Sequence, residues 1–205
     1  NTGGAYHPSA MIYDNMVVAA TDTPAPTPEP EPTPEADDLF VSEYGEGPSG
    51  TSSWGKYLEI ANFTGADVSL NGYILGGVTN GGDAYEKYVS FTADATIANG
   101  DVWVIGRAES GDGSPEALHT QIDQVNTDIT HNGDDAWHLL AGTSDSYTLV
   151  DAAIGDAGDD PGSGFTVCGD GTTANVTLIR KPLVDGAADW ATSAGTDASS
   201  CQWTI

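Results

Sequence analysis

The chain has 205 residues, and its 31 Asp and Glu against 5 Lys and Arg give a formal net charge of −26. Five basic side chains cannot form the positive stripe that binding to nucleic-acid phosphates or to an anionic membrane surface requires. The apolar fraction of 39%, with five Trp and eight Tyr, is too high for a disordered acidic chain. Abundant Gly and Pro predict many turns and short strands around one substantial core. The sequence lacks any run of about 18 apolar residues that could form a spanning helix.

The N-terminal segment, residues 1–21, contains a single apolar run of β type over residues 10–20. One strand has neither a ladder partner nor a core, so it must pair elsewhere. One partner is a missing upstream domain, since residues 13–18 resemble the closing strand of concanavalin-like jelly rolls. The other is an open sheet edge, in the same molecule or in a neighbouring copy. The donor-strand residues are Met11, Ile12, Tyr13, Met16, Val17 and Val18.

Residues 22–37 form a spacer rich in Pro and Glu, in which Pro recurs at every second position from Pro24 to Pro34. Proline cannot donate a backbone hydrogen bond, and such a run favours extended polyproline II. We therefore expect a semi-rigid linker between the N-terminal segment and a folded domain over residues 38–205.

From residue 38 onward the pattern is all-β, with short runs separated by turn signals such as Asn71-Gly72. Residues 115–124 are predicted as a helical turn, and Trp190 and Trp203 as core side chains at the ends of a sandwich. The predicted strands are 39–44, 57–63, 68–75, 87–92, 102–106, 118–122, 136–141, 147–151, 176–180 and 201–205.

Several blocks of this domain follow one another in a recognisable order. The opening blocks are 39–47, 56–65 and 68–73, the central one is Asn132-Gly133-Asp134-Asp135-Ala136, and the last are 177–182, Asp189-Trp190 and Gln202-Trp203. These blocks resemble bacterial lamin tail domains. The resemblance covers about residues 38–205 and implies an immunoglobulin-like β-sandwich. Similar domains are accessory modules on secreted nucleases, phosphatases and surface proteins, with no established catalysis of their own.

Cys168 and Cys201 fit no CxxC metal or redox pattern, and we predict a disulfide rather than two free thiols. It would close a loop of about 30 residues and contribute roughly 3–4 kcal/mol in the chain-entropy model. A disulfide implies an oxidising compartment. With the acidic composition, this predicts an extracellular or cell-surface protein, and the family resemblance points to a bacterium.

The sequence contains no complete motif for a known type of catalytic site. Residues 50–56 fit the G-x-x-x-x-G-K skeleton of a phosphate loop, but Tyr57 replaces the magnesium-binding hydroxyl and a strand follows instead of a helix. Neither a G-x-S-x-G elbow nor an H-E-x-x-H motif occurs. His131 and His138 flank a turn, where packing at the surface or at a strand end explains them better than zinc binding. We therefore expect no enzymatic activity.

Calcium is the cofactor that the acidic loops favour, because it prefers several oxygen ligands on loops rich in Gly and Asp. EF-hand spacing is absent, and the alternative is that these side chains cap turns and solvate the surface. Arg180 and Lys181 are predicted to pair with acidic loops across a contact between molecules. The candidate calcium ligands are Asp134, Asp135, Asp156, Asp159, Asp160, Glu43, Glu46 and Glu59.

Two functions follow from these features. The first is a non-enzymatic extracellular structural protein whose N-terminal strand inserts into a sheet edge of the next copy. Because a head-to-tail contact need not close, it would build a filament. The alternative is a C-terminal accessory or binding module of a larger secreted hydrolase or nuclease. Expected partners are copies of the chain, without nucleic acid or membrane insertion, and association should strengthen with salt or calcium.

Overall fold

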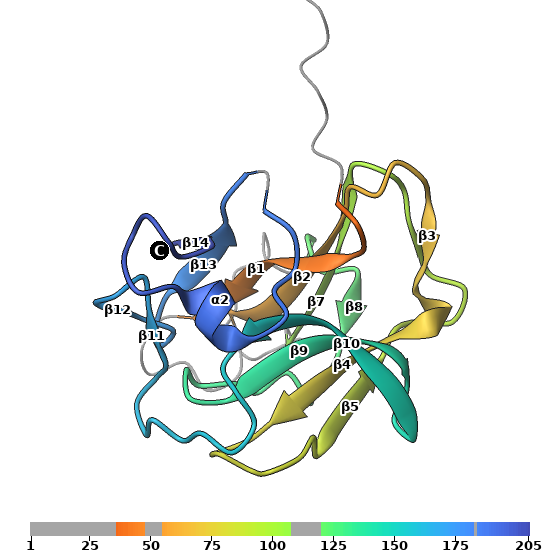
Figure 1. The fold of residues 1–205 in the computed structure, drawn as a ribbon. Helices are drawn as coiled ribbons and strands as arrows, with labels where there is room; N and C mark the ends of the chain where they lie inside the picture. The colour runs from red at the N-terminus through yellow and green to blue at the C-terminus, as the bar shows by residue number, and fades with distance from the viewer. Residues whose placement is uncertain (1–35, 48–54, 108–119, 183) are drawn as a thin grey trace, which may run out of the picture. The chain divides into compact units, whose positions relative to one another are not determined.

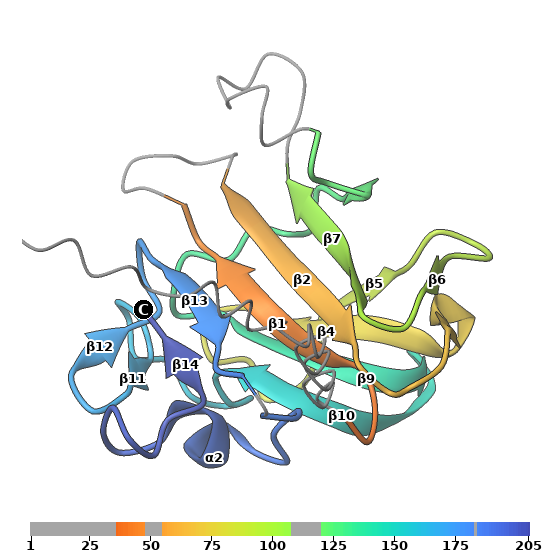
Figure 2. The same ribbon diagram turned by 90° about the horizontal axis from the view of Figure 1, so that it is seen from above.

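The structure is a computed structural model that describes residues 36–47, 55–107, 120–182 and 184–205. Two β-sheets pack face to face around one core, as Figures 1 and 2 show. The predicted spacer and donor strand, up to residue 35, lie outside the described residues.

The larger sheet has six strands in the order β14-β13-β1-β2-β7-β8, and only the β7–β8 pair is parallel. Its longest ladder pairs β2 with β7 over seven residues of each strand. The strands are β1 (Phe40–Gly45), β2 (Lys56–Asn62), β7 (Asp101–Arg107), β8 (Gln124–Val125), β13 (Thr177–Arg180) and β14 (Trp203–Thr204).

The smaller sheet has four antiparallel strands in the order β10-β9-β4-β5. Its strands are β4 (Tyr73–Val78), β5 (Lys87–Ser90), β9 (Ala136–Thr143) and β10 (Ser146–Ile154). Two short ribbons complete the β-structure: β3 (Val68–Ser69) pairs with β6 (Thr96–Ile97), and β11 (Thr166–Val167) pairs with β12 (Gly171–Thr172).

The core between the sheets is built by alternation along the strands. On β2, Leu58 and Ile60 are fully buried and Glu59 points away from the core, as its period-2 pattern predicts. Trp190 and Trp203 are also buried, which confirms their predicted packing role. Cys168 and Cys201 form the predicted disulfide, with Cα atoms 5.0 Å apart and 33 residues along the chain.

Some predicted elements were wrong. The strand over 68–75 is interrupted by the 3-10 helix η1 (Leu70–Gly72), where the Ser69 hydroxyl caps the turn and Leu70 enters the core. A strand was predicted at 118–122 and a helical turn at 115–124. The described part of both, residues 120–123, is neither strand nor helix, and β8 begins at Gln124. The helix α2 (Trp190–Ala194) was not predicted, because five residues are too few to show a helical period.

Candidate functional site: the open edge and outer face of the small sheet

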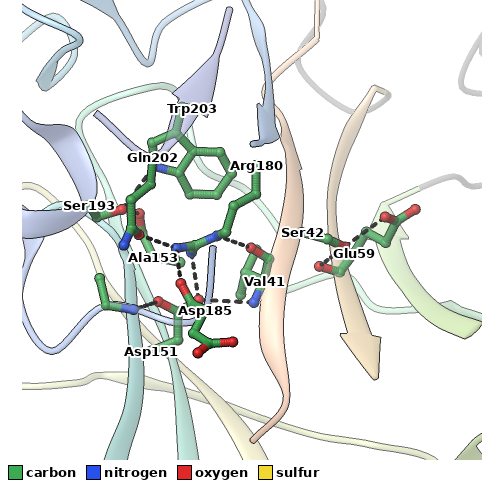
Figure 3. A network of polar contacts seen from close by, with 11 residues as sticks. Val41, Ser42, Glu59, Asp151, Ala153, Arg180, Asp185, Ser193, Gln202 and Trp203 are labelled. Atoms are coloured by element: carbon green, nitrogen blue, oxygen red, sulfur yellow. Dashed lines mark hydrogen bonds and ion pairs between the residues drawn. The ribbon is translucent and has the colours of Figure 1, made fainter. Parts of the chain in front are cut away.

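Asp151 and Arg180 form a buried ion pair at the junction of the two sheets (Figure 3). Asp151 Oδ2 lies 2.7 Å from Arg180 Nη2 and accepts the Val41 amide at 2.9 Å, while Oδ1 accepts the Ala187 amide at 2.7 Å. The guanidinium also donates to the Val41 carbonyl and lies 4.3 Å from the Trp203 ring centre. Because each charge is paired and hydrogen-bonded, this network fixes β1, β10, β13 and β14 together.

The prediction that Arg180 and Lys181 pair with acidic loops of another molecule was wrong for Arg180, whose side chain is buried within its own domain. Lys181 is half-buried, and its Nζ donates to the carbonyls of Ala198 at 2.6 Å and Cys201 at 2.7 Å. Both cations therefore stabilise the C-terminal part of the domain.

A second buried pair joins Glu46 and Lys56, with 3.0 Å between Oε1 and Nζ. Lys56 also donates to the His131 carbonyl at 2.5 Å, so the lysine of the phosphate-loop skeleton is occupied inside the protein. The His131 Nε2–H donates to the Gly45 carbonyl at 2.6 Å. Burial lowers the pKa of His131 to about 3, and the ring is therefore neutral at physiological pH.

Both His131 and His138 are buried, so the surface position that was predicted as one alternative is wrong. His138 lies within β9, where Nε2–H donates to the Gly155 carbonyl at 2.8 Å and Nδ1 accepts the Tyr85 hydroxyl at 2.5 Å. Burial lowers the pKa of His138 as well. Each histidine is thus a neutral core residue that joins two distant segments of backbone.

Glu43 and Glu59 lie directly opposite each other on β1 and β2, on the outer face of the large sheet. Glu43 accepts the Tyr57 hydroxyl, and Glu59 accepts the Ser42 hydroxyl at 2.7 Å. Partial burial and the neighbouring Glu43 charge raise the pKa of Glu59. Glu46 is buried elsewhere with Lys56, so the three glutamates do not converge.

The acidic loop residues are also held separately. Asp135 Oδ1 accepts the Asn80 amide at 3.1 Å, and Asp134 is buried beside it. Asp156, Asp159 and Asp160 are exposed, and Asp160 accepts the Gly162 amide at 2.9 Å in a local turn. Across the described ranges, no three His, Cys, Asp or Glu side chains gather in a metal-binding group. Calcium binding therefore stays a prediction from composition.

All five basic residues lie in the described ranges, and none of them is exposed. Lys56 and Arg180 are buried in ion pairs, while Lys87, Arg107 and Lys181 are half-buried. The Lys87 ammonium bonds the Thr130 hydroxyl and lies 5.9 Å from the Trp137 ring centre. The outer surface of the described domain is consequently anionic, which makes it unsuited to binding phosphate-rich partners.

The first half of β10 is the longest open edge of the described sheets. At the other edges, β14 and β8 have two residues each and β5 has four. The second half of β10 is covered, since the Ala152 amide donates to the Ala187 carbonyl at 2.8 Å. Residues 146–149 are all exposed, including Tyr147 at 41% and Leu149 at 44%. Backbone groups and apolar side chains are thus available together along this edge.

Three tyrosines from three segments meet on the outer face of the small sheet, next to this edge. The Tyr85 ring centre lies 5.4 Å from that of Tyr147 and 6.1 Å from that of Tyr88. Tyr88 and Tyr147 are 6.1 Å apart. Desolvation, the hydrogen bond with Tyr147 and the charge of Asp145 together raise the pKa of Tyr88. The three rings therefore form one aromatic cluster on this face of the sheet.

Sequence reasoning did not find Tyr85, Tyr88, Tyr147 and Leu149 as members of one site. The alternation of Tyr147 and Leu149 in the predicted strand 147–151 was the available signal, because both residues belong to one face of a strand. Which strand ends at a sheet edge depends on long-range pairing that the pattern does not contain.

Comparison with known proteins agrees with this fold. A family model for the Lamin Tail Domain matches residues 32–196, and the chain belongs to that family. The family consists of non-catalytic, immunoglobulin-like structural domains, and the predicted family and β-sandwich fold are confirmed. No curated protein and no solved structure shows a significant match to the chain. No helix of the described ranges is both long and apolar enough to cross a membrane.

Proposed function

We propose that this lamin tail domain protein is a non-enzymatic structural protein outside the cell, and that it assembles by strand donation. Residues 11–18 of one copy would add to the open edge of β10, over residues 146–150, in the next copy. The single observation that carries the proposal is this open edge, which combines unpaired backbone with the exposed Tyr147 and Leu149.

Backbone pairing supplies the attraction. Along an antiparallel edge strand, alternate residues direct their N–H and C=O groups away from the sheet. An added strand satisfies these groups, and its alternate side chains contact the neighbouring face. Residues 11–18 are mostly apolar and contain one acidic residue, Asp14, so the donor can approach an acidic domain with little repulsion.

The spacer allows the donor to reach a second molecule. Residues 22–35 contain six prolines at close intervals and would extend by about 3 Å per residue as polyproline II. A spacer of roughly 40 Å would hold the donor strand away from its own domain and favour pairing with a neighbour. Each copy carries one donor and one acceptor edge, so repetition of this contact gives an open filament.

The alternative is an accessory module at the end of a larger secreted hydrolase or nuclease. The resemblance of residues 13–18 to the closing strand of concanavalin-like jelly rolls favours this second function. The coding sequence upstream of Asn1 distinguishes the two. A signal peptide there supports the structural protein, whereas a long folded domain supports the accessory module.

The assembly test measures the oligomeric state of the full chain by size-exclusion chromatography with light scattering, and its shape by negative-stain imaging. We expect the wild type to form filaments, and Val17→Pro in the donor or Leu149→Lys at the acceptor edge to leave monomers. Ile179→Lys is the matched control, because Ile179 is similarly exposed but lies on β13 of the other sheet. Wild-type monomers at high concentration, or filaments of Val17→Pro, would contradict the proposal.

A further inference from the structure

A groove of about 410 Å³ opens on the outer face of the small sheet, beside the tyrosine cluster. Its apolar lining includes Tyr88, Phe91 and the buried Ile74, and its polar lining includes Ser90 on the β5 side and Thr143 and Ser144 at the end of β9. Its volume is within the range of sites that hold small organic ligands, which combine aromatic surface with a few polar groups.

We infer that this groove binds a neutral oligosaccharide. The site is separate from the proposed strand donation and does not depend on it. A sugar ring has an apolar C–H face that packs on an aromatic ring and hydroxyls that exchange hydrogen bonds with Ser and Thr. The groove presents both kinds of surface side by side.

The aromatic wall is already positioned. Tyr88 is held by Tyr85 and Tyr147, each with its ring centre 6.1 Å away. Rigid tyrosines lose little conformational entropy when a ligand packs on them. On the rim, the side-chain amide of Asn71 donates to Asp94 Oδ1 at 3.2 Å, and the backbone amide of Asp94 donates to Asn71 Oδ1 at 2.9 Å. This double hydrogen bond fixes the turn after β3 against the loop after β5.

The hydrogen-bonding side is available. Ser90, Thr143 and Ser144 are exposed, and within the described ranges their hydroxyls make no hydrogen bond to protein. Each hydroxyl can donate once and accept twice, which suits a polyhydroxyl ligand.

The charge around the groove selects a neutral ligand. Its lining contains neither a basic nor an acidic side chain. Two acidic residues lie beside it: Asp94, which is bonded to Asn71, and Asp145, which is near Tyr88. A phosphate, sulfate or uronic acid would therefore meet repulsion without a cation to pair with. A basic peptide would lack a carboxylate within the groove to bind.

The test titrates full-length protein with linear hexasaccharides by isothermal calorimetry, in about 0.5 M NaCl to screen bulk charge. The neutral probes are the hexaoses of β-1,4-linked glucose, xylose and mannose. Hexagalacturonate is the anionic probe, and hexaglucosamine and a hexalysine peptide are the cationic probes. We expect at least one neutral hexaose to bind, and the charged probes to bind more weakly or not at all.

Variants locate the binding. Tyr88→Ala should weaken it by about tenfold or more, Tyr88→Phe should keep it within about threefold, and Ser144→Trp should block it. Ile179→Ala, on the other sheet, is the control, and circular dichroism confirms that every variant folds. Val17→Pro should bind like the wild type, which separates this site from strand donation. Absence of binding by every neutral hexaose at about 10 mM, preference for a charged probe, or full binding by Tyr88→Ala would overturn the inference.

Discussion

Asp151 is fully buried and accepts hydrogen bonds from two backbone amides and from Arg180. Replacing it with Ala would leave the Arg180 charge and both amides without their acceptor. Breaking a buried pair in this way costs about 3–5 kcal/mol. We expect Asp151→Ala to lower the unfolding free energy by that amount in urea titration at pH 7. The exposed Asp145→Ala should change it by less than about 0.5 kcal/mol, and a similar small effect at Asp151 would contradict this account.

His131 makes stability depend on pH in a defined direction. Its pKa is about 3 in the folded protein and about 6.5 in the unfolded chain, so only the unfolded state takes up a proton between these values. The contribution of His131 to the free energy of unfolding is therefore complete above about pH 6.5 and is lost as pH falls towards 3. The loss from His131 alone reaches about 2–3 kcal/mol at about pH 4.5.

His131→Gln removes this titration while retaining an N–H donor for the Gly45 carbonyl. Urea unfolding at about pH 7 and about pH 4.5 should show a smaller pH effect in this variant, by about 2–3 kcal/mol. The exposed neighbour variant Asn132→Ala should keep the wild-type pH dependence. An unchanged pH dependence in His131→Gln would show that the imidazole is protonated in the folded state.

The sequence predicted residues whose environment follows from local pattern. Leu58 and Ile60 were placed in the core by alternation, and the Trp190 and Trp203 side chains by their size. The burial of the two histidines was not predicted, because their partners, Gly45 for His131 and Gly155 for His138, come from other segments. A neutral histidine is stable in a core where such carbonyls accept its N–H. The local sequence around each histidine does not predict these carbonyl partners.

Among the elements, the disulfide between Cys168 and Cys201 closes the part of the chain that contains α2 and β13. For a separation of 33 residues, the chain-entropy model gives about 3–4 kcal/mol of stabilisation. We expect the double variant Cys168→Ala, Cys201→Ala to lose roughly this amount in urea titration. A reducing agent should destabilise the wild type and leave the double variant unchanged, and equal stability of both proteins would contradict the prediction.

The longest strands were predicted well, whereas several of the two-residue strands were missed. The strands β2, β7, β9 and β10 have seven to nine residues and were found within a few residues of their bounds. The strands β6, β11 and β12 have two residues each and were missed. Two residues cannot show alternation, and only pairing with a distant partner makes them strands. The open edge of β10 escaped prediction for the same reason.

At the scale of the whole molecule, residues 36–205 carry 26 acidic and five basic residues, a formal charge of −21. Because none of the basic residues is exposed, acidic side chains dominate the surface and neighbouring copies repel each other. Raising salt from about 0.1 M to about 1 M shortens the Debye length from about 10 Å to about 3 Å. We therefore expect light scattering to show stronger association at high salt. Calcium should add to this effect at constant ionic strength, and chelation should reverse it. Weaker association at high salt would show that charge pairs hold the copies together.

The positions of the five basic residues have a consequence for digestion by proteases. Proteases of the trypsin type cut only after Lys or Arg, and the chain has no such residue before Lys56, so the proline spacer offers them no cleavage site. Lys56, Lys87, Arg107 and Arg180 lie in β-strands, and Lys181 is followed by Pro182. A strand held in a sheet cannot enter a protease cleft without local unfolding. The placement of these side chains thus limits cleavage of the spacer and of the described strands by this class of protease.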